Sequence, residues 1–69
     1  IMTYRVSVFK YLEVPKTIAH ETVQGTEEEA IALSKKILLS SDGDVVVVAL
    51  VSGGETRVIQ RFEKTKKAS

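Results

Sequence analysis

Few side chains in this 69-residue chain could perform chemistry, and His20 is the first to consider. To act as a general base it would need a positioned nucleophile or acid partner. No such partner stands at triad-like spacing in the sequence. We therefore interpret His20 as a surface or half-buried strand residue, and we expect a protein that is not an enzyme and has no catalytic residues.

Two other clusters could bind an ion or a phosphate. The glutamates at 27–29 lack the alternating ligands and the central glycine of a calcium loop. The glycine-rich segment 52–55 (S-G-G-E) leads into another expected strand, whereas a phosphate-binding loop leads into a helix. Because the chain has no cysteine and one histidine, a structural zinc site is not expected either. The sequence therefore predicts no metal and no cofactor.

Basic side chains near the C-terminal end make the best case for nucleic acid. Arginines on a strand can bind phosphates, and nearby aromatic rings can stack on bases. By strict alternation, Arg57 and Arg61 share one face of the expected last strand, but Glu55 and Glu63 stand in the same region. The net charge of +1 indicates no polyanion or membrane surface as a partner. We keep nucleic-acid binding as the alternative function, with these contact residues: Arg57, Arg61, Lys64, Lys66 and Lys67.

Hydrophobic periodicity predicts the elements that must position these side chains. Period-2 alternation and β-branched residues indicate strands, and apolar residues at helical spacing indicate one helix. Short connections around Pro15 and around Gly53-Gly54 predict antiparallel hairpins. We expect a basic, frayed tail at 64–69. The predicted ranges are strands at about 4–12, 17–24, 45–51 and 56–63 and a helix at about 27–39.

The start of the helix carries the clearest local signal. Thr26 can cap it, and Glu29 stands at the position that returns a hydrogen bond to the N–H of the cap. Acidic residues in the first turn also suit the positive end of the helix dipole. One apolar stripe should face a sheet and comprises Ala30, Leu33, Ser34, Ile37 and Leu38.

The run Val45–Val51 is apolar on both faces of a strand, which predicts that both faces are buried. We therefore expect a single α+β domain over 1–69 in the order ββαββ, with an antiparallel four-stranded sheet and one helix packed on one face. The second face would have no cover within the chain. Its expected interface residues are Phe9, Tyr11, Val46, Val48 and Leu50.

An uncovered apolar face of this kind predicts an interface. A chain this short buries only about 60% of its unfolded surface, so a core of its own is marginal. With no cysteine or metal set to stabilise the fold, we expect a homodimer or a protein target, formed sheet on sheet or edge to edge. In the alternative, the Pro15 loop or the C-terminal tail covers the face. No apolar run is long enough to span a bilayer, so we expect no membrane partner.

The order of elements, with T-E-E-E-A-I-A-L-S-K-K opening the helix, resembles several small bacterial and phage proteins. Certain small anti-CRISPR proteins, which inhibit a host machine by binding it, are among them. The resemblance implies a phage- or mobile-element-type inhibitor or another small bacterial protein. We expect a non-enzymatic regulatory protein that acts by protein–protein binding. The absence of cysteine and of a signal-peptide core further predicts a cytoplasmic protein.

Overall fold

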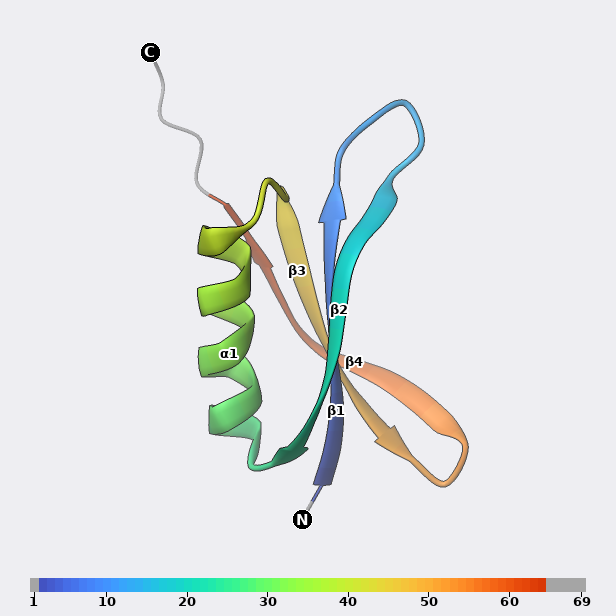
Figure 1. Cartoon of the computed structure of the whole chain (residues 1–69). Coiled ribbons are helices and arrows are strands. Elements are labelled where there is room, and N and C mark those ends of the chain that lie inside the picture. The colour runs from blue at the N-terminus through green and yellow to red at the C-terminus, as the bar shows by residue number, and fades with distance from the viewer. Residues whose placement is uncertain (1, 65–69) are drawn as a thin grey trace.

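The computed structural model describes residues 2–64 of the chain, and within them the fold is a four-stranded antiparallel sheet with one helix (Figure 1). The predicted fold class and element order are confirmed. The first strand ends at Lys10, two residues before the end that the sequence predicts. Of the predicted tail, only Lys64 is among the described residues. The elements are β1 (Met2–Lys10), β2 (Lys16–Gly25), α1 (Glu27–Ser40), β3 (Val45–Ser52) and β4 (Glu55–Glu63).

The sheet has the order β2-β1-β3-β4, so the two hairpins join through a central antiparallel pair, β1 and β3. Helix α1 stands along one side of the sheet, and the two hairpin ends extend beyond it in opposite directions (Figure 1). Its main contacts are with β1, β3 and β2. Outer strand β4 is therefore the least covered part of the sheet on that side.

Helix α1 begins as the sequence predicts. The Glu29 N–H donates to Thr26 Oγ1 at 3.2 Å, and the Thr26 N–H donates to Glu29 Oε1 at 3.0 Å, which completes a capping box. Ala30, Ser34 and Leu38 are buried against the sheet. The hydroxyl of buried Ser34 has a hydrogen-bond partner within the helix, because it donates to the carbonyl of Ile31 at 2.6 Å.

The core lies between α1 and the central strands. In the β1–β3 register Val6 faces Val48 and Val8 faces Val46, and all four side chains are fully buried. Paired residues of an antiparallel ladder point to the same face, so this register places both β3 valines beneath the helix. Leu50 joins them by pairing with Tyr4.

The expected grouping of Val46, Val48 and Leu50 on an uncovered face is therefore wrong. The alternation along β3 was correct, but the register with β1 decides which half of it meets the helix. The face opposite α1 is lined instead by the other β3 residues, which are Val45, Val47, Ala49 and Val51.

Candidate interaction surfaces

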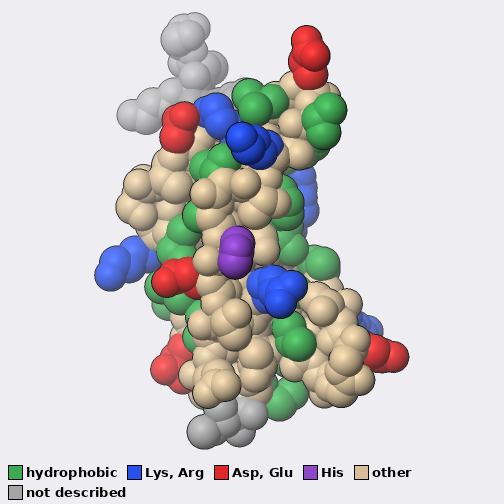
Figure 2. Space-filling model, turned by 45° about the vertical axis from the view of Figure 1, so that its right-hand side comes forward, with side chains coloured by type: hydrophobic (Ala, Val, Ile, Leu, Met, Phe, Trp, Pro, Cys, Tyr) green, Lys and Arg blue, Asp and Glu red, His purple; other side chains and the backbone are tan. Residues whose placement is uncertain are grey.

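The sheet face opposite α1, hereafter the open face, has no other element of residues 2–64 packed on it. The β3 residues form an apolar stripe down its middle. From β1 the flanking side chains are Thr3, Arg5, Ser7 and Phe9, and from β4 they are Thr56, Val58, Arg61 and Glu63. Apolar, polar and charged residues therefore share the face, and Figure 2, which turns this side toward the viewer, shows hydrophobic side chains in small separate groups.

The apolar stripe is partly shielded by its own neighbours. Val45 and Ala49 are only 3% and 5% exposed, while Val47 and Val51 are half-buried. Val58, beside Ala49, is 62% exposed. The surface that water reaches on the open face is thus narrower than the sequence pattern predicts.

A side-chain bridge crosses one end of the open face. Arg61 donates from Nη1 to Glu63 Oε1 and from Nη2 to the Tyr11 hydroxyl, each at 2.7 Å. The bridge joins the end of β1 to β4 across β3, at the level of buried Val45. The hydrogen bond and charge of Glu63 raise the pKa of Arg61 above its ordinary value. The register with Val45 places Phe9 on the open face as well, and the hydroxyl of Tyr11 helps to fix this end.

The two arginines of the nucleic-acid alternative do not share one surface. Ile59 is an extra residue in β4, where Val48 pairs with Gln60 and Ala49 with Val58. This β-bulge breaks the alternation, so Arg57 shares the helix face with Leu50 while Arg61 lies on the open face. The expectation that both arginines share a face is wrong for that reason.

The lysines of the same set are only partly described. Lys64 Nζ donates to the carbonyl of Ser41 at 2.8 Å, which places its ammonium group at the end of α1. Lys66 and Lys67 lie outside the described residues. The described basic residues therefore point in different directions.

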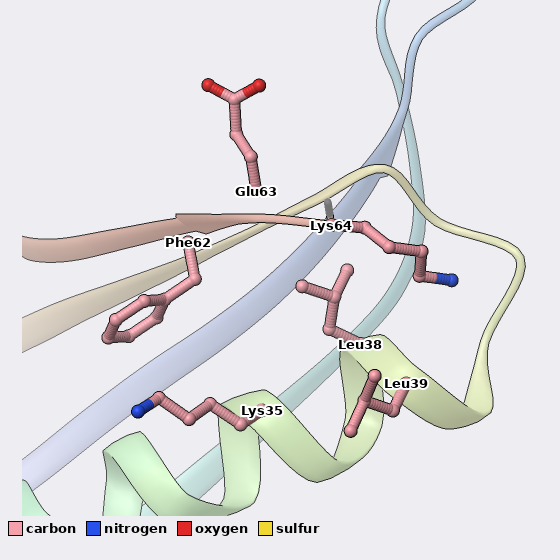
Figure 3. A pocket seen from close by; sticks show the side chains of 6 residues that line it. All are labelled: Lys35, Leu38, Leu39, Phe62, Glu63 and Lys64. Atoms are coloured by element: carbon pink, nitrogen blue, oxygen red, sulfur yellow. The ribbon is translucent and has the colours of Figure 1, made fainter. Parts of the chain in front are cut away.

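A second candidate surface, which the sequence did not predict, is a groove of about 360 Å³ between α1 and β4 (Figure 3). We call it the α1–β4 groove. Lys35, Leu38 and Leu39 line it from the helix, and Phe62, Glu63 and Lys64 line it from the strand. Leu39 is 78% exposed at its rim. The only signal of this groove in the sequence is Leu39, an apolar residue that lies outside the predicted helix stripe.

The residues first considered for chemistry lie on a strand and in a hairpin turn. His20 is exposed on β2 and pairs with Ser7. Gly53 and Gly54 take φ of 56° and 82° in the turn between β3 and β4, as a tight hairpin requires. Within residues 2–64 no three His, Asp or Glu side chains gather to hold a metal ion. The described part of the chain also contains no helix with the length and apolarity of a membrane span.

Comparisons with models of known protein families, with curated proteins and with solved structures find no match for this chain. The two candidate surfaces, the open face and the α1–β4 groove, therefore rest on geometry and chemistry alone.

Proposed function

We propose that this chain is a small non-enzymatic interaction protein that associates through its open sheet face, with a second copy of itself as the occupant. The observation that carries the proposal is the central strand β3, which has valines on both faces and a helix over only one of them within residues 2–64. Half-buried Val47 and Val51, with exposed Val58 beside them, would gain burial in an interface.

The small core gives a physical reason for association. Its largest fully buried apolar side chains are valines, contributed by β1 and β3. Such a core leaves a 69-residue domain close to the lower limit of stability for a single chain. Burying apolar surface of the open face against a second copy would add to that stability.

The outer strands favour face-to-face over edge-to-edge association. Each carries one extra residue, Ile18 in β2 and Ile59 in β4. Bulges and charged side chains on outer strands disfavour long strand-to-strand pairing. Two sheets can instead pack face to face about a two-fold axis, with the apolar stripe of each copy on that of the other.

The proposal extends to a regulatory role in which the dimer acts by occupying the surface of a target protein. The sequence offers no nucleophile–base pair, and surface binding requires none. We also propose a cytoplasmic location, which the absence of cysteine from the sequence supports. Nucleic-acid binding receives less support, because Arg57 and Arg61 lie on opposite faces.

The test is sedimentation over a range of concentrations, with one variant in the open face and one matched control. We expect the wild-type chain to sediment as a dimer at micromolar concentration. Val58→Asp should give a folded monomer, because it places a carboxylate in the interface. Val14→Asp, at an exposed valine of the β1–β2 loop, should remain a dimer. A wild-type chain that stays monomeric at high micromolar concentration would contradict the proposal.

A further inference from the structure

The α1–β4 groove combines an apolar floor with an accessible strand edge. Leu38 and Phe62 contribute apolar surface from its two sides, and Leu39 adds an exposed rim (Figure 3). A groove between a helix and an outer strand is the geometry in which an extended peptide can add to a sheet. The side chains of the peptide then fill the groove, and the backbone of the peptide pairs with the strand.

The backbone of β4 has the required free groups next to the groove. The Lys64 N–H donates inward to the carbonyl of Asp44 at 2.8 Å. Since hydrogen-bonding direction alternates along an antiparallel strand, the N–H and C=O groups of Arg61 and Glu63 point to the outer edge. Among the described residues, β4 pairs with β3 and with no strand on that outer side.

The charges around the groove favour an acidic occupant. Lys35 Nζ lies 4.9 Å from the centre of the Phe62 ring, and the ammonium of Lys64 lies near the end of α1. The one carboxylate among the lining residues, that of Glu63, points away from the helix and is bonded to Arg61 (Figure 3). The side of the groove that faces the helix is therefore positively charged.

We infer that the α1–β4 groove binds a short extended segment of another protein, in which apolar residues alternate with acidic ones, as a fifth strand along β4. The bulge at Ile59 restricts pairing between the peptide and β4 to the part of β4 that follows the bulge. We therefore expect the bound segment to be short. None of the described strands of this chain alternates acidic and apolar residues, so a second copy does not fit. The inference concerns a different surface from the proposed dimer and does not rest on it.

The experiment is an NMR titration of the ¹⁵N-labelled full chain with an acetylated hexapeptide that alternates leucine and glutamate. We expect the amide signals of Arg61 and Glu63 to shift, because their N–H groups would donate to the peptide. A hexapeptide that alternates leucine and lysine serves as the probe of opposite charge. It should bind about tenfold more weakly or not at all at low salt.

Matched variants separate the groove from general electrostatic attraction. Lys35→Glu reverses a charge at the groove and should weaken binding of the glutamate peptide about tenfold. Lys36→Glu makes the same change at the next helix position, which does not line the groove, and should leave binding within about twofold of wild type. Leu39→Ser removes the exposed apolar rim without disturbing the core and should also weaken binding.

Three outcomes would overturn the inference. The first is no amide shift at Arg61 or Glu63 with the glutamate peptide at millimolar concentration. The second is an equal loss of binding in Lys35→Glu and Lys36→Glu, which would indicate only bulk charge. The third is a set of shifts confined to Val47, Val51 and Val58 on the open face, with none at Arg61 or Glu63. The state of association of the chain, measured on the same samples, tests the proposed dimer separately.

Discussion

The two faces of β3 carry the same kind of side chain in different environments. On the helix face, Val46 and Val48 are fully buried against β1 and α1. On the open face, Val47 and Val51 are only half-buried, and their cover comes from side chains on neighbouring strands. Residue type alone therefore does not decide how deeply a valine of β3 is buried.

The difference between the two faces comes from the β1–β3 register and from the presence of helix α1 on one side of the sheet. Pairing with Val6 and Val8 makes one set of β3 valines continuous with the helix stripe. The other set pairs with Arg5 and Ser7, whose polar groups need water or a polar partner. The helix face therefore stabilises the fold, whereas no other element of residues 2–64 packs on the open face.

The largest expected effect comes from placing the same charge on each face. Val48→Asp would bury a carboxylate beneath α1, which costs several kcal/mol and is comparable with the whole stability of a small domain. We expect it to unfold the chain, as circular dichroism would show. Val58→Asp, on the open face, should retain the native spectrum. A folded Val48→Asp protein would contradict the assignment of the two faces.

The next effect concerns packing at the end of the helix face. Gly43 is buried, and a Cβ added there would overlap Val8 Cγ1. Its φ does not lie in the left-handed region, so the effect would come from packing alone. Gly43→Ala should lower the free energy of unfolding by about 1–3 kcal/mol, measured by urea denaturation. An unchanged midpoint would mean that this end of the core is loosely packed.

A smaller effect should follow from loosening the helix that covers one face. Thr26→Ala removes the oxygen that accepts from the Glu29 N–H, and should lower the free energy of unfolding by about 1 kcal/mol. Thr26→Ser keeps that oxygen and should remain close to wild type. Equal losses in both variants would show that the cap does not stabilise α1 through this hydrogen bond.

The smallest effect concerns an exposed ion pair that ties the α1–β3 loop to β1. Lys10 Nζ lies 2.7 Å from Asp42 Oδ2, and this hydrogen bond lowers the pKa of Asp42 and raises that of Lys10. Because the carboxyl pKa is lower in the folded chain, its contribution is complete above about pH 5 and is lost as the pH falls through the folded pKa. Asp42→Asn should reduce the acid dependence of the urea midpoint. An identical pH profile in the variant would exclude a stabilising role for the pair.

Local signals in the sequence predicted the elements well. The capping box of α1, the Gly53-Gly54 turn and the order ββαββ all follow from residue types within a few positions of each other. These features depend on short-range hydrogen bonds and backbone preferences. A sequence records such preferences directly.

Features that depend on pairing between distant segments were not predictable. The β1–β3 register placed Val46 and Val48 under the helix, and the bulge at Ile59 separated Arg57 from Arg61. One extra residue reverses the face of every residue beyond it, and nothing in the local pattern marks its position. The α1–β4 groove was missed because it exists only where the helix and the outer strand meet.

Association through the open face is tested by an isotope-filtered NOE experiment on a mixture of labelled and unlabelled chains, which detects contacts between copies only. We expect intermolecular NOEs from the methyl groups of Val47, Val51 and Val58 on the open face. We expect none from Val46 and Val48 beneath α1. Intermolecular NOEs that avoid the open face, or none at a concentration where sedimentation shows dimers, would contradict association through this face.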